Sequence, residues 1–210
     1  MNNNYEINKL RVQQLGLTAT IKDDRGQEHY FYRGHEYVEI GRLKWAATNV
    51  GAEKESDSGL YFAFGETQGY TADQVRRGKR KFISKEYTNV NFDSVKAYWG
   101  GKWRMPTAYE FESLFEAATS RWVDDYQGSG VNGRLFTDKT DRSKKLFFPA
   151  VGTCLSTNIY NVDSLSYYWL SSNMDNNFQN GGCLYLNRNY YCISCNSRLV
   201  GLPIRGVIGK

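Results

Sequence analysis

Residues 101–118 read Gly-Lys-Trp-Arg-Met-Pro-Thr-Ala-Tyr-Glu-Phe-Glu-Ser-Leu-Phe-Glu-Ala-Ala and contain the clearest element boundary of the chain. Thr107 and Glu110 have the spacing of a capping box, in which each side chain accepts a hydrogen bond from a free backbone N–H of the first turn. Pro106 ends the extended segment before them. Apolar residues then recur at helical spacing, at Phe111, Leu114, Phe115 and Ala118. The pattern predicts a helix from Thr107 with one face in the core.

Shorter elements are expected on both sides of this helix. Short apolar runs bounded by glycines or by Asn- and Ser-rich stretches predict strands. These runs are residues 36–40, 43–47, 145–149, 167–170, 183–186 and 202–207. Thr71 with Gln74 begins a short helix, and residues 93–98 form another that stops at Gly100. The sequence contains no tandem repeat and no linker, so we expect residues 34–210 to form one domain.

The first 33 residues have a different pattern. Leu15, Leu17, Ala19 and Ile21 alternate with polar residues, which predicts one exposed strand before a turn at residues 23–26. We interpret residues 1–33 as an N-terminal arm. It is a place for attachment or for contacts between copies of the chain.

The composition is typical of a β-rich binding domain. The 210 residues include 16 Tyr, 11 Phe, 5 Trp and 20 Gly but only 3 Pro, which suggests short strands joined by loops. The net charge is +5, and the densest basic cluster is Arg76, Arg77, Lys79, Arg80 and Lys81. Because this cluster is short and not interleaved with aromatic residues, we expect no nucleic-acid partner. The sequence shows no signal peptide and no membrane-spanning run, so no membrane insertion is expected.

The sequence predicts no catalytic residue, no metal site and no cofactor. Cys192 and Cys195 form a CxxC pair, but structural zinc needs four ligands. Both histidines, His29 and His35, lie far upstream. If residues 192–195 are extended, the two thiols point to opposite faces of the strand.

The last quarter of the chain differs in composition from the rest. Between Leu165 and Arg205 there is no Lys and no Glu, whereas Asn, Tyr, Ser and Arg are frequent. Tyr provides contact area at a low cost in rotamer entropy, and Asn and Ser provide adaptable hydrogen bonds. Alternation predicts a half-buried strand, with Leu184 and Leu186 inward and residues 183, 185 and 187 outward. Residues 173–200, here the Asn-rich segment, therefore read as a binding surface.

A set of short motifs, in order along the chain, resembles the FISUMP-type family of C-type-lectin-like domains. The motifs are Trp45-Ala-Ala-Thr-Asn-Val-Gly51, Gly59-Leu-Tyr-Phe-Ala-Phe-Gly-Glu66, Gly101-Lys-Trp-Arg-Met-Pro-Thr107, Phe147-Phe-Pro-Ala-Val-Gly152, Tyr168-Trp-Leu-Ser-Ser172 and Ile204-Arg-Gly-Val207. The resemblance covers residues 34–207. It implies an α+β class and a C-type-lectin-like fold with short strands, two main helices and long loops.

The Asn-rich segment is similar to the diversified part of variable proteins of diversity-generating retroelements, many of them carried by bacteriophages. In those systems template adenines are randomised, mostly in Asn codons, and residues 173–200 fit the accessible amino acids except at Met174 and Gln179. The resemblance implies a non-catalytic protein for receptor recognition and host attachment. Its partner would be a protein or glycan receptor on a cell surface. Its location would be a virion tail or the bacterial cell surface.

The predicted ligand-binding residues lie within the Asn-rich segment. They are Asn173, Asp175, Asn176, Asn177, Tyr185, Asn187, Asn189, Tyr190, Tyr191, Cys192, Ser194, Asn196, Arg198 and Leu199. We expect the aromatic residues and Arg198 to contribute most of the binding energy. The expected rigid base is Trp45, Trp103, Phe111, Leu114, Phe148, Trp169, Leu184 and Leu186. Two alternatives remain, namely an oxidase similar to formylglycine-generating enzymes, with a copper-holding cysteine pair, and an ordinary bacterial adhesin domain.

Overall fold

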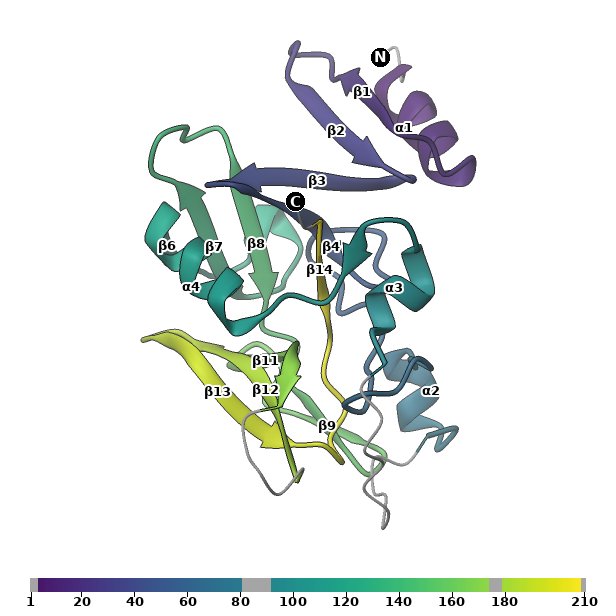
Figure 1. Cartoon of the computed structure of the whole chain (residues 1–210), viewed down its shortest axis with the longest axis vertical. Coiled ribbons are helices and arrows are strands. Elements are labelled where there is room, and N and C mark those ends of the chain that lie inside the picture. The colour runs from purple at the N-terminus through teal and green to yellow at the C-terminus, as the bar shows by residue number, and fades with distance from the viewer. Residues whose placement is uncertain (1–3, 81–91, 174–178, 209–210) are drawn as a thin grey trace.

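The computed structural model in Figure 1 describes residues 4–80, 92–173 and 179–208. Strands make up 43% of the described residues and helices 19%. The expected α+β class, with its C-type-lectin-like fold and two main helices, is therefore wrong, because the described chain is mostly β with four short α-helices. The physical reason is that apolar residues keep a helical period over one segment, residues 107–118. Elsewhere, short aromatic-rich runs pair as strands.

The strands and helices follow one another in a fixed chain order. The helices are α1 Asn4–Gln14, α2 Ala72–Arg76, α3 Ser94–Trp99, α4 Ala108–Ala117 and a 3₁₀ turn, η1, at Tyr126–Gly128. The strands are β1 Ala19–Lys22, β2 Glu28–Tyr32, β3 His35–Ile40, β4 Leu43–Asn49, β5 Trp103–Arg104, β6 Ala118–Val123, β7 Gly133–Asp138, β8 Lys145–Pro149, β9 Thr153–Leu155, β10 Asn158–Tyr160, β11 Leu165–Asn173, β12 Asn180–Asn187, β13 Tyr191–Ser197 and β14 Arg205–Ile208.

Four antiparallel sheets form among the described residues. The largest has the order β1-β2-β3-β4-β14-β5, so the C-terminal strand β14 inserts between β4 and β5. The others are β6-β7-β8, β11-β12-β13 and the pair β9-β10. Figure 1 shows β14 running through the middle of the molecule, with α4 between the β6-β7-β8 sheet and the β11-β12-β13 sheet. The β11-β12-β13 sheet contains most of the Asn-rich segment.

Local sequence patterns predicted many of these elements. The expected strands at residues 36–40 and 43–47 are confirmed as β3 and β4, and Gly41 between them has a φ of 64°. The capping boxes of α2 and α4 are both present. At the N-terminus, α1 and the β1–β2 hairpin replace the single strand that we expected. Val12 is the one buried residue of α1, so that helix has no apolar stripe to reveal it. No helix in the described ranges combines the length and the hydropathy that a bilayer crossing needs.

The core consists mainly of two large clusters of apolar side chains. One contains Trp103 and Trp169, and the other contains Trp45 and Phe111. Every residue of the expected rigid base is fully buried, which confirms Trp45, Trp103, Phe111, Leu114, Phe148, Trp169, Leu184 and Leu186 as framework.

Arg205 is a fully buried cation inside this framework. Its guanidinium donates to Asn49 Oδ1 at 2.9 Å, to the Ala46 carbonyl at 3.0 Å and to the Phe147 carbonyl at 2.8 Å. It also lies 4.6 Å from the centre of the Phe148 ring. Since β14, β4 and β8 all contribute contacts, this one side chain ties three strands together.

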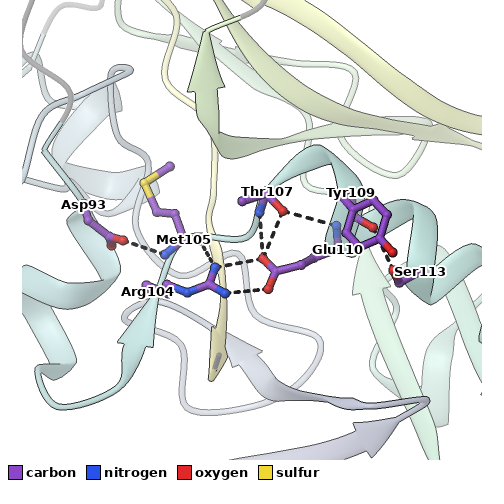
Figure 2. A network of polar contacts seen from close by, with 7 residues as sticks. All are labelled: Asp93, Arg104, Met105, Thr107, Tyr109, Glu110 and Ser113. Carbon is purple, nitrogen blue, oxygen red and sulfur yellow. Dashed lines mark hydrogen bonds and ion pairs between the residues drawn. The ribbon is translucent and has the colours of Figure 1, made fainter. Parts of the chain in front are cut away.

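The start of α4 is held by a network of polar contacts, shown in Figure 2. The Thr107 hydroxyl accepts from the Glu110 N–H at 3.2 Å, and the Glu110 carboxylate accepts from the Thr107 N–H at 2.9 Å. Arg104 donates to both oxygens of the same carboxylate. Asp93, at the start of α3, accepts from the Met105 N–H at 2.9 Å. The network therefore connects α3, β5 and α4.

We expect Glu110→Gln to lower the free energy of unfolding by about 1–2 kcal/mol at neutral pH, because it removes a charge-assisted pair with Arg104 and weakens a helix cap. Burial alone would raise the pKa of Glu110, but Arg104 and the Thr107 N–H lower it below its ordinary value. The stabilisation is therefore complete above the unfolded-state pKa and is lost as the pH falls through the lower folded-state pKa. Urea titrations at several pH values should show the two proteins converging in acid. A constant difference would contradict this assignment.

Candidate ligand-binding surface

The two faces of the β11-β12-β13 sheet have different surroundings. Tyr168, Leu184 and Ile193 stand opposite one another across the three strands and pack into the core. Tyr167, Tyr185 and Cys192 stand opposite one another on the other face. We call the exposed or half-buried end of that second face, next to the β12–β13 turn, the outer face. Its residues are Tyr167, Tyr185, Asn187, Tyr190, Cys192 and Ser194.

Three tyrosines form the centre of the outer face. The ring of Tyr185 lies 4.9 Å from that of Tyr167 and 5.3 Å from that of Tyr190, measured between centroids. Asn187 Nδ2 donates to the Tyr185 hydroxyl at 2.8 Å. A hydrogen bond with Tyr185 raises the pKa of the Tyr190 phenol above its ordinary value. The cluster thus offers aromatic area together with hydroxyl and amide groups.

The β12–β13 turn is held by its own Asn187 side chain and by Arg134 of β7. Asn187 Oδ1 accepts from the N–H groups of Asn189 and Tyr190, at 2.8 and 2.9 Å. The buried Arg134 side chain donates to the Asn187 carbonyl at 2.8 Å and to the Arg188 carbonyl at 3.1 Å. The position of the tip therefore depends on β7 as well as on its own sequence.

Arg188 links the turn to the neighbouring β6 strand. Its guanidinium pairs with the Asp124 carboxylate and lies 5.7 Å from the centre of the Trp122 ring. Both members of the ion pair are mostly exposed, so their pairing adds little stability. The contact does place the half-exposed Trp122 ring beside the turn.

Some of the predicted binding residues are displayed and others are not. Tyr185, Asn187, Tyr190, Cys192 and Ser194 lie on the outer face, Asn189 is exposed at the turn, and Asn196 and Leu199 are half-buried. Asp175, Asn176 and Asn177 lie outside the described residues. Asn173 ends β11, and its side chain is not among those described.

Tyr191 and Arg198 do not lie on the outer face with the other predicted residues. Tyr191 stands opposite Leu186, so the alternation of the strand turns it inward, where its ring lies 4.6 Å from Phe115. Arg198 is 5% exposed, and its guanidinium lies 4.6 Å from the centre of the Phe64 ring. Arg198 is therefore buried, and the half-buried Tyr191 packs against the core from the inner face of the sheet.

Three residues next to the surface were not predicted. Tyr167 lies inside the compositionally biased stretch but before residue 173, where the predicted binding surface begins. Trp122 and Arg134 lie outside that stretch altogether. Tyr167 could have been found from alternation, because Tyr168 beside it reads as a core residue. The roles of Trp122 and Arg134 depend on contacts between sheets, which no local pattern encodes.

The four cysteines fall into two classes. Cys154 and Cys183 are buried, whereas Cys192 and Cys195 are exposed. Cys183 stands on the same face of the sheet as Tyr185, as expected, but it is buried, because core residues cover the end of that face near Trp169. Cys192 pairs with Tyr185 and Cys195 with Gly182, so the two exposed thiols point to opposite faces of β13. The CxxC pair is therefore not brought to one site. In the described parts of the chain, no three His, Cys, Asp or Glu side chains gather in a metal-binding group.

We expect a maleimide to label Cys192 and Cys195 in the folded protein and to spare the other two cysteines. Burial raises the pKa of Cys154 to about 12 and that of Cys183 well above its usual value, so neither forms thiolate at neutral pH. Peptide mass spectrometry with and without urea measures the difference. Rapid labelling of Cys183 without urea would contradict the placement of β12.

A small pocket lies away from the outer face. It has a volume of about 40 Å³ and is lined by Phe64, Gly65, Phe92, Asp93, Met105, Leu170 and Ser171. This volume is far below that of ordinary small-molecule sites.

In comparisons with known proteins, no family model, no curated protein and no solved structure matches the chain.

Proposed function

We propose that the chain is a non-catalytic recognition protein that binds a protein or glycan receptor on a cell surface through the outer face and the β12–β13 turn. The observation that carries the proposal is the alternation along β12 and β13. Leu184 and Leu186 are fully buried, whereas Tyr185 and Asn187 between and after them face outward. A sheet built in this way can change its outward side chains without changing its core.

The chemistry of the outward residues supports the proposal. Tyrosine combines an apolar ring with a hydroxyl, and such residues dominate binding energy at interfaces. Asn187 and Ser194 add hydrogen-bonding groups without a net charge. In the proposal, residues 173–200 are diversified by a retroelement of the kind described above. The chain acts on a virion tail or at the bacterial surface, with the N-terminal arm as its attachment.

Binding to whole bacterial cells tests this function. The full chain, labelled with a fluorophore and made multivalent on beads, is mixed with a panel of strains, and Tyr185→Ala/Tyr190→Ala beads are compared on every strain that binds. Tyr109→Ala is the matched control, because Tyr109 is 75% exposed on α4, away from the outer face. We expect the double variant to lose binding and the control to keep it. Binding that survives the double variant would overturn the proposal.

The DNA around the gene tests the diversification. We expect a reverse-transcriptase gene and a second, near-identical copy of the DNA that encodes residues 173–200. The two copies should differ at positions where the template has adenine. Differences spread over all four bases would contradict a retroelement and favour an ordinary adhesin.

A further inference from the structure

The two edges of the β11-β12-β13 sheet are treated differently by the rest of the chain. On the β11 edge, the backbone N–H of Trp169 donates to the Pro203 carbonyl at 3.1 Å, and the backbone N–H of Ser171 donates to the Pro106 carbonyl at 2.9 Å. The Leu165 carbonyl on the same edge accepts from Gly152 at 3.0 Å. Main-chain groups of other segments therefore cover that edge. At the β13 edge, the Ser197 carbonyl at the end of the strand accepts from the Val200 N–H at 3.1 Å, but within the described ranges no such contact is found at Tyr191, Ile193 or Cys195.

The register identifies which backbone groups of β13 point away from the sheet. The Asn187 N–H donates to the Tyr190 carbonyl at 3.0 Å, and hydrogen-bonded pairs then recur at every second residue of an antiparallel ladder. Cys192 and Ser194 thus bond to β12. Tyr191, Ile193 and Cys195 direct their N–H and C=O groups outward.

β13 has none of the features that normally prevent an edge strand from pairing. Its seven residues, Tyr-Cys-Ile-Ser-Cys-Asn-Ser, include no charge and no proline, and its pairing with β12 shows no register shift. None of the seven is buried. By comparison, β1, at one edge of the largest sheet, has four residues and carries Lys22. Figure 1 shows β13 along the outside of the molecule.

We propose that β13 pairs antiparallel with β13 of a second copy of this chain, about a two-fold axis at Ile193. This register pairs Tyr191 with Cys195 of the other copy and Ile193 with its own equivalent. All three outward N–H groups of each copy then find a carbonyl. The axis also sets Cys192 opposite Ser194 on the outer face and brings the two half-buried Ile193 side chains together on the inner face.

A second copy satisfies every requirement of this edge. The outward groups repeat with the spacing of an extended backbone, so their natural partner is another strand. A two-fold contact needs the same patch on both sides, and self-pairing of an uncharged strand places no like charges opposite each other. The product is one continuous six-stranded sheet with both outer faces on the same side. This pairing stands independently of the proposed receptor binding, although a dimer would give that binding two adjacent sites.

Sedimentation equilibrium of the full chain, in a reducing buffer, tests the pairing. We expect a reversible dimer, and we expect Cys195→Pro to weaken it at least about tenfold, because proline removes one outward N–H per copy at a position where an edge strand tolerates it. Cys195→Ser keeps the N–H and is the matched control, so it should leave the dimer intact. A monomer at all concentrations up to about 100 μM would overturn the proposal. A dimer that Cys195→Pro does not weaken would also overturn it.

Amide hydrogen exchange reads the same interface without a substitution. In the dimer, the N–H groups of Tyr191, Ile193 and Cys195 should exchange at least about tenfold more slowly at high than at low protein concentration. Those of Cys192 and Ser194, which bond to β12, should be protected at both concentrations. Exchange at Ile193 that is independent of concentration would contradict the pairing even if Cys195→Pro did not fold.

Discussion

Replacement of Arg205 by Met is expected to lower the free energy of unfolding by about 4 kcal/mol, since removal of one partner from a buried hydrogen-bonded network leaves the others unsatisfied. The Arg205 guanidinium donates hydrogen bonds to the carbonyls of Ala46, Ala47 and Phe147 and to the side-chain oxygen of Asn49. Methionine fills a similar volume and donates to none of these acceptors. Urea unfolding followed by tryptophan fluorescence measures the loss.

Two further substitutions show whether the loss comes from this geometry. Lysine keeps the charge but lacks the planar fork, so Arg205→Lys should recover only part of the stability. The exposed Arg142 provides the control, and Arg142→Met should change the unfolding free energy by less than about 0.5 kcal/mol. A loss below about 1 kcal/mol for Arg205→Met would mean that water or other donors replace the guanidinium.

Tyr191→Ala is expected to cost about 3 kcal/mol of stability, and Tyr190→Ala less than about 0.5 kcal/mol. The two residues are adjacent and of the same type, which makes each the control for the other. Tyr191 is half-buried, and its ring packs on the core residues Phe115 and Phe136, with ring centroids 4.6 and 5.2 Å away, and under the guanidinium of Arg134. Tyr190 is 54% exposed, and its ring contact is with Tyr185.

Thermal and urea unfolding of the two single variants provide the comparison. Equal losses would show that the alternation of β13 differs from the one described here. A large loss for Tyr190→Ala with a small one for Tyr191→Ala would mean that the strand is turned over, with the outer face in the core.

Local elements could be predicted from the sequence because their causes are local. The two residues of each capping box, Thr107 with Glu110 in α4 and Thr71 with Gln74 in α2, are three positions apart. The boxes can therefore be recognised from the local sequence. The fold class was predicted incorrectly because it depends on how strands far apart in the chain pair. The insertion of β14 between β4 and β5 joins residues about 160 positions apart, and no short motif records such a contact.

The candidate surface could be predicted in outline but not residue by residue. Alternation correctly assigned Leu184 and Leu186 to the core and Tyr185 to the surface. It gave the correct face for Cys183 but not its burial, because core residues such as Phe64 and Trp169 cover that end of the face. Arg198 was taken for a binding residue because of its type, yet it packs on Phe64 from a different segment. Periodicity gives the face of a strand, and only tertiary contacts decide how far along that face the core extends.

A scan that replaces each of residues 184–194 by aspartate, read out as resistance to protease, tests most directly whether β12 and β13 divide into a fixed and a changeable face. Aspartate in the core leaves a buried charge unpaired, whereas on the outer face it stays hydrated. We predict resistance to be kept at Tyr185, Asn187, Tyr190, Cys192 and Ser194 and lost at Leu184, Leu186, Tyr191 and Ile193. Two results would contradict the account: loss of protease resistance at every position, or resistance kept and lost in a pattern that does not alternate along the strands.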